Sequence, residues 1–183
     1  MWAQPRMSIL QITDGQELTQ IYRRVLVSDD VLGAPFVDGL VSIGVFFPTR
    51  AYRITEPQFH ALRAATGPLN CYILEIEEPI FPGEGRHWRL ANSSYEEYLQ
   101  HAFGFALHTA YVDAQARWVV VIGDDQFGRV GITPALCREF LQAFPQAEDQ
   151  LQGLERVWRN YGNHGQMVNL LAEIRENQRR YGA

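Results

Sequence analysis

Residues 116–131 have the sequence ARWVVVIGDDQFGRVG, and this stretch decides the fold. Residues 118–122 are apolar at every position, which predicts a strand that is buried on both faces inside a sheet. A second strand is predicted over 127–132, and the Gly-Asp-Asp segment between the two has the residue types that a hairpin turn requires. The stretch therefore predicts two paired strands, the first of them central in its sheet.

Further elements are predicted on both sides of this pair. Helices are expected over 15–27, 55–67 and 94–103, with Asp14, Thr55 and Ser94 as their capping residues. Because strands cluster in the middle of the chain and helices at both ends, we expect an α+β fold with a central, mainly antiparallel sheet, flanking helices and a helical C-terminal third. The additional strands are predicted over 40–47, 51–55, 70–77 and 105–112.

The length of 183 residues fits one domain. We expect a single domain over 1–183, in which a three-helix portion, 133–183, packs on a mixed portion, 1–132. The segment 78–92 is rich in proline and glycine and is predicted to be a long surface loop. Apolar spacing predicts the inner faces of the three helices: Leu136, Cys137, Phe140, Leu141 and Phe144; Leu151, Leu154, Val157, Trp158 and Tyr161; Met167, Val168, Leu170, Leu171 and Ile174.

The charge of the chain limits its function classes. All sixteen basic residues are arginines, so catalysis by a lysine nucleophile or a phosphate-binding P-loop lysine is excluded. The formal net charge of −5 argues against a nucleic-acid partner and favours a basic protein partner. No apolar run is long enough to span a membrane and no signal-peptide pattern is present, so we expect a cytoplasmic protein that starts at Met1 or Met7.

The sequence contains none of the common catalytic or nucleotide-binding motifs. Cys137 lies on an apolar helix face, which predicts an inert thiol, and nothing ties Cys71 to a histidine. His101 and His108 could converge with Glu97 on a metal, but isolated histidines are more often ordinary side chains, so no metal or cofactor is expected. Asp124 and Asp125 are interpreted as turn residues rather than metal ligands.

Two segments are candidate partner-binding sites. One is the end of the predicted loop, where Arg86, His87, Trp88 and Arg89 offer charge, a titratable ring and a stacking surface; the alternative is a connector anchored by Trp88. The other is the acidic end of the strand over 70–77, where Glu75 and Glu77 share one face and Glu78 follows, with Glu96 and Glu97 further on. The alternative there is a sheet edge protected by charge.

Residues 116–131, together with the FLQAFP sequence of residues 140–145, resemble small bacterial immunity proteins that neutralise polymorphic or contact-delivered toxins. Many of those proteins have a tryptophan-led strand, an acidic turn, a glycine-bearing strand and a helix that ends in Phe-Pro. The resemblance is one of residue pattern, and it covers about thirty residues of the chain. It implies a cytosolic, non-catalytic protein binder, and it assigns no functional residue, because neutralising residues vary between toxin pairs.

These observations predict a protein-binding module, most concretely an immunity protein that neutralises a cognate toxin by occlusion. The candidate contact residues are Glu75, Glu77 and Glu78 with the segment 86–89. The alternative is a small enzyme or ligand-binding domain, with or without a bound metal, whose pocket draws on His87, His101, His108 and Trp88. A third interpretation is an oligomeric scaffold that assembles through the C-terminal helices.

Overall fold

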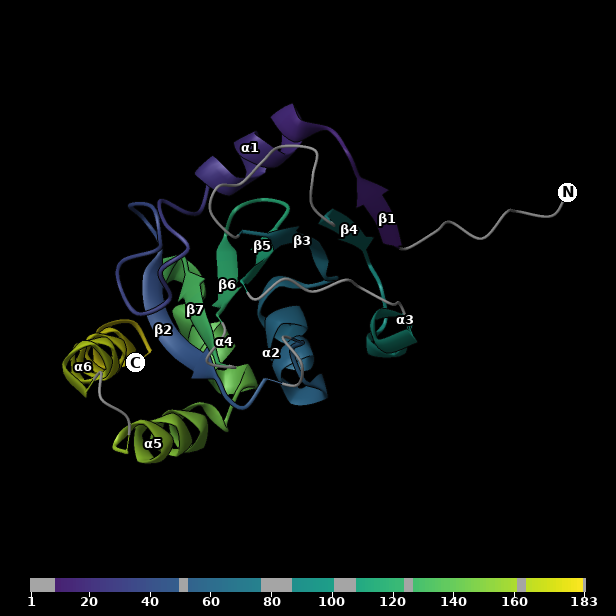
Figure 1. The fold of residues 1–183 in the computed structure, drawn as a ribbon. Helices are drawn as coiled ribbons and strands as arrows, with labels where there is room; N and C mark the ends of the chain where they lie inside the picture. Colours follow the sequence, from purple (N-terminus) through teal and green to yellow (C-terminus); the bar gives the residue numbers. More distant parts are fainter. Residues whose placement is uncertain are drawn as a thin grey trace, which may run out of the picture.

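The fold is built on one antiparallel sheet, in a computed structural model that describes residues 9–49, 53–76, 87–100, 108–123, 127–160 and 164–182. Seven strands in these ranges lie in the order β1-β4-β3-β5-β6-β7-β2 (Figure 1). The predicted α+β class with a central antiparallel sheet is confirmed. The strands are β1 (Ile9–Ile12), β2 (Val41–Phe46), β3 (Asn70–Glu75), β4 (His87–Ala91), β5 (Thr109–Asp113), β6 (Trp118–Ile122) and β7 (Gly128–Ile132).

Helices interrupt and follow the strands, and the predicted helical C-terminal third is confirmed. Within the described ranges, no helix combines the length and the apolar composition needed to cross a bilayer. The helices are α1 (Gly15–Arg23), α2 (Glu56–Thr66), α3 (Tyr95–Gln100), α4 (Cys137–Ala143), α5 (Ala147–Trp158) and α6 (His164–Tyr181), with a short 3-10 turn, η1 (Pro134–Leu136), before α4.

Strand β6 lies inside the sheet, as its sequence predicts. It pairs with β5 on one side and with β7 on the other, and all five of its residues are buried. Trp118 and Val120 point into one core, and Val119 and Val121 point into the other. An apolar side chain at every position is therefore required, because neither face of β6 meets solvent.

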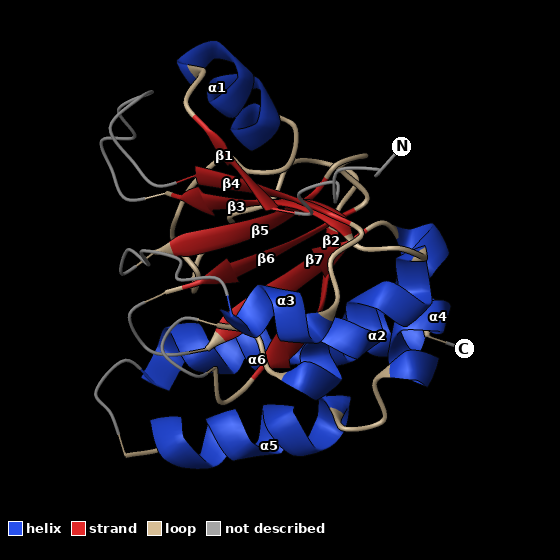
Figure 2. Cartoon of the chain, turned by 90° about the vertical axis from the view of Figure 1, so that its right-hand side faces the viewer, coloured by secondary structure: helices blue, strands red, loops and turns tan. Residues whose placement is uncertain are grey.

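Helices pack on both faces of the sheet. Figure 2 shows α1 near the β1 edge of the sheet and α5 near the opposite edge. Residues of α2, α3 and α4 share a core with Trp118 and Val120, and we call this side the α2 face. Residues of α1, α5 and α6 share a core with Val119 and Val121 on the opposite side, the α1 face. Both cores rest on the same sheet, and the C-terminal helices contribute residues to each of them.

The three predicted capping residues begin their helices. Asp14 Oδ1 accepts a hydrogen bond from the backbone N–H of Gln16 at 2.8 Å. Ser94 and Glu97 form a reciprocal capping box at the start of α3, with N···O distances of 2.7 and 3.1 Å. Thr55 is the N-cap of α2, and its backbone N–H donates to Gln58 at 2.8 Å.

Two strands of the structure were not predicted from the sequence, and one predicted strand is not formed by its described residues. The surface loop predicted over 78–92 is wrong for residues 87–91, which form β4 between β1 and β3. β1 was not predicted, because its four residues show no extended alternation of apolar and polar side chains. Residues 53–55, from the strand predicted over 51–55, contain an isolated bridge at Arg53 and the N-cap of α2.

The helices differ at their ends and in two inward positions. α1 ends at Arg23, since Leu26 leaves the helix to pair with Phe36 in an isolated bridge. Val157 and Val168 were predicted to face inward, but both are exposed. On each helix the adjacent apolar residue, Trp158 or Met167, is buried in the core instead.

A buried arginine ties three parts of the fold together. Arg129, in the interior strand β7, is only 2% exposed. Its guanidinium donates to Ser42 Oγ of β2 at 2.6 and 2.9 Å and to both carboxylate oxygens of Glu173 on α6 at 2.9 Å. It also donates to the backbone oxygens of Val31 and Gly33. The loop over residues 28–38, the sheet and α6 therefore share one cation.

The same loop packs directly on a glycine of β7. A Cβ atom added to Gly131 would lie 2.7 Å from the ring of Phe36. We expect Gly131→Ala to lower the free energy of unfolding by about 1–3 kcal/mol, because the packed ring must move. Gly165→Ala, with no atom within 4 Å of the added Cβ, is the control. Equal denaturation midpoints for the two variants would contradict the close approach.

Candidate functional site

The acidic candidate residues do not form one surface within the described residues. Glu75 is half-buried at the end of β3, opposite Thr109 of β5. Glu96 and Glu97 are exposed on α3. This helix follows β4 at the opposite end of β3 from Glu75, where Asn70 pairs with Ala91. Glu77, Glu78 and Arg86 lie outside the described residues.

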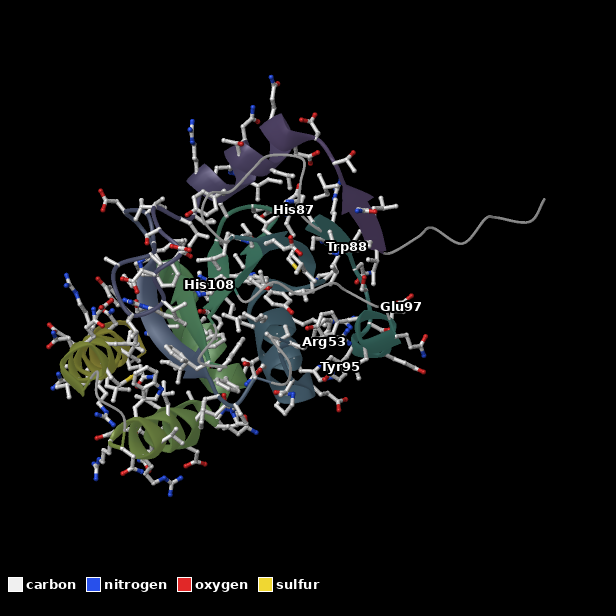
Figure 3. All side chains as sticks on the ribbon, viewed as in Figure 1. Arg53, His87, Trp88, Tyr95, Glu97 and His108 are labelled. Carbon is white, nitrogen blue, oxygen red and sulfur yellow. The ribbon has the colours of Figure 1, made fainter. Side chains whose placement is uncertain are left out.

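His87, Trp88 and Arg89 are neighbours in β4, so their side chains alternate between the two faces of the sheet. Trp88 is half-buried against the core of the α2 face, and it lies in a strand rather than in the connector considered as the alternative. Arg89 lies on the α1 face and is exposed. Figure 3 shows Trp88 on the side of α3 and His87 nearer to α1. Of these three side chains, Arg89 is the one that solvent reaches most freely.

His87 is 3% exposed, so its ring does not reach the surface of the described fold. Ile12 of β1 lies beside it, and neither ring nitrogen has a hydrogen-bond partner among the described residues. Burial lowers the pKa of the imidazole, because the charged form is poorly solvated there. The ring is therefore a neutral, buried group rather than a surface contact.

The candidate site that the structure brings together is the sheet edge formed by β1 and β4. Leu10, Arg89 and Tyr72 face each other across three strands on the α1 face. Leu10 is 42% exposed and Tyr72 is half-buried. We call these three residues the edge row. They place an apolar, a cationic and an aromatic side chain beside the backbone of β1.

The two edge strands of the sheet, β2 and β1, differ in what packs against them. β2, at one edge, packs against both α5 and α6. β1, at the other edge, pairs with β4, and no other strand among the described residues pairs with it (Figure 1). A strand in this position presents backbone N–H and C=O groups to whatever approaches it. Sequence reasoning missed this edge because strand order is not encoded in local patterns.

The histidines do not assemble a metal site in the part of the chain that the structure describes. His108 Nδ1 lies 3.3 Å from Asp29 Oδ2, and both side chains are partly exposed. His87 and Trp88 point to opposite faces of the sheet, so the two do not line a common pocket. His101 lies outside the described residues, and Glu97 caps α3.

Both cysteines are buried. Burial raises the pKa of the Cys71 thiol far above its usual value and that of Cys137 to about 11. Cys137 Sγ donates to the backbone oxygen of Thr133 at 3.6 Å, one helical turn earlier. The thiols therefore stay protonated at neutral pH, and the inert thiol predicted for Cys137 fits this environment.

The predicted turn after β6 joins antiparallel neighbours, since Ile122 pairs with Gly128 of β7. Asp124 and Asp125 themselves lie outside the described residues.

No protein-family model, curated protein or solved structure matches this chain. The resemblance of residues 116–145 to toxin immunity proteins accordingly stays a prediction.

Proposed function

We propose that this protein is a cytoplasmic protein-binding module, most concretely an immunity protein that neutralises a cognate bacterial toxin by covering its active surface. The observation that carries the proposal is the β1 edge with its edge row, Leu10, Arg89 and Tyr72. A polypeptide is the ligand class that a strand edge recognises, because a partner strand can pair with its backbone groups.

Side chains of the edge row would select the partner. Leu10 offers exposed apolar area, and the Tyr72 ring lies two strands away on the same face. The guanidinium of Arg89, between them, fits a carboxylate or carbonyl oxygen of the partner. This arrangement resembles a small interface core in which apolar contact supplies affinity and one charged group supplies orientation.

The charge of the whole chain supports a basic partner. A net charge of −5 attracts a basic toxin domain over distances longer than any one contact. Such steering raises the association rate and weakens as salt is added. Glu77 and Glu78 remain candidate contacts from the sequence, whereas Glu75 is half-buried in the sheet.

The experiment first captures partners of the tagged protein from lysate of the source organism in which secretion systems are expressed. The purified partner is then titrated against the wild type, Leu10→Asp, Arg89→Glu and the control Val27→Asp, which alters an exposed apolar residue outside the edge row. We expect each edge variant to bind at least about tenfold more weakly and the control to bind like the wild type. Co-expression should also protect cells from the partner.

Two results would overturn the proposal. The first is that no partner is captured under those conditions. The second is a partner whose toxicity is unaffected by the wild-type protein. Equal binding by all four proteins would move the interface away from the edge row while leaving neutralisation itself to be judged by the protection assay.

A further inference from the structure

A groove runs between α5 and α6, and it is separate from the β1 edge. Both helices pack against β2, at the opposite edge of the sheet from β1 (Figure 1). The groove has a volume of about 720 Å³ and adjoins a second hollow of about 500 Å³. Glu155, Val168 and Leu171 line both spaces, so the two form one continuous depression along the helices.

An apolar stripe of α6 forms the floor of this groove. Val168 lines it and is 49% exposed, and Leu171 and Ala172 lie beside it. Residues 168, 172, 175 and 179 are spaced four, three and four apart, which places them on one face of the helix. From Met167 to Arg179 the floor is about 18 Å long at the rise of an α-helix.

The charges around the groove do not cancel. Glu155 accepts hydrogen bonds from Arg159 at 3.0 Å and from Arg175 at 2.8 Å. Glu148 lies 3.9 Å from the same Arg175 guanidinium. Arg179 also lines the groove, one turn beyond Arg175, and it has no carboxylate partner among the described residues. The groove therefore carries an uncompensated cation in a chain that is acidic as a whole.

We infer that this groove binds an acidic amphipathic helix of a partner protein. Its apolar stripe would lie on Val168 and Ala172, which are exposed on α6, and its carboxylate would pair with Arg179. Residues of both helices line the depression, so it offers a third helix a surface between two neighbouring ones. The inference does not depend on the function proposed above, because the two surfaces share no residue.

Two synthetic helical peptides of about 18 residues test the inference by fluorescence anisotropy. In both peptides, leucines spaced alternately three and four residues apart form an apolar stripe. The residues beside this stripe are glutamates in one peptide and lysines in the other. We expect the wild type to bind the glutamate peptide at least about tenfold more tightly than the lysine peptide. Val168→Asp should weaken binding of the glutamate peptide by a similar factor, and Arg179→Glu should reverse the preference between the peptides.

Val157→Asp is the matched control, because Val157 is an exposed valine of α5 that does not line the groove. Arg180→Glu is the control for charge, since the Arg180 guanidinium lies over the Tyr181 ring. Circular dichroism confirms that each variant is folded. The inference is overturned if neither peptide binds, if both bind equally, or if the control variants weaken binding as much as Val168→Asp and Arg179→Glu.

Discussion

Replacing Arg129 by alanine is expected to lower the free energy of unfolding by about 2–4 kcal/mol, because each buried acceptor left without its donor costs about 1–3 kcal/mol. Arg129 is almost fully buried in β7 and lies over the Phe36 ring at 5.4 Å. Its loss leaves Ser42 Oγ and the backbone oxygens of the loop over residues 28–38 without their donor. Urea unfolding at neutral pH measures the change.

The control is Arg63→Ala on the exposed face of α2, which should change stability by no more than about 0.5 kcal/mol. A double-mutant cycle with Glu173→Ala separates the ion pair from the loop contacts. Glu173 is 47% exposed and regains water when Arg129 is removed, so we expect a coupling of about 0.5–3 kcal/mol, smaller than the total loss. A total loss below about 1 kcal/mol would show that Arg129 does not hold the loop and α6 to the sheet.

The role of Arg129 also shows where sequence reasoning stops. An arginine between Gly128 and Val130 in a short strand has the pattern of an exposed position. It is buried because Glu173, 44 residues later, supplies a carboxylate and because the loop over residues 28–38 closes over it. Both partners come from segments whose position is set by the fold, so no local pattern could indicate the pair.

Elements whose stability is local were predicted well. β6 is apolar at every position, and α2 and α3 begin at capping sequences that form the expected hydrogen bonds. β4 depends on its neighbours instead, because pairing with both β1 and β3 extends a segment that follows several prolines and glycines. Its residues therefore resemble a loop until strand order is known.

The candidate site likewise combines residues that the sequence indicated with residues that only the tertiary structure brings together. Trp88 and Arg89 were singled out by residue type, and the structure places them in β4, one strand from the sheet edge. Leu10 and Tyr72, which complete the edge row with Arg89, come from strands about sixty residues apart in sequence. Cross-strand register joins them, and register is set by tertiary packing on both faces.

His87 is expected to make the protein less stable in acid. Burial lowers the pKa of its imidazole in the folded state, whereas the unfolded chain has the ordinary value near 6.5. As the pH falls through about 6.5, the unfolded state takes up a proton before the folded state does, so the free energy of unfolding decreases. Above that pH both states are neutral at this residue and its contribution to stability is complete.

His87→Leu removes this proton uptake. Between about pH 7.5 and about pH 5, we expect the free energy of unfolding to fall further for the wild type than for the variant, as measured by urea unfolding at each pH. At about pH 7.5 the variant should be the more stable protein by about 1–3 kcal/mol, because neither buried ring nitrogen has a partner among the described residues and leucine suits the apolar neighbour Ile12.

His60→Gln is the matched control, since His60 is exposed and lies 3.6 Å from Glu56 one helical turn earlier. Removing this exposed histidine should leave the loss of stability in acid close to that of the wild type, because an exposed side-chain pair contributes little to stability. If His87→Leu kept the pH dependence of the wild type while His60→Gln abolished it, the acid sensitivity would belong to the surface of α2 rather than to the buried ring in β4.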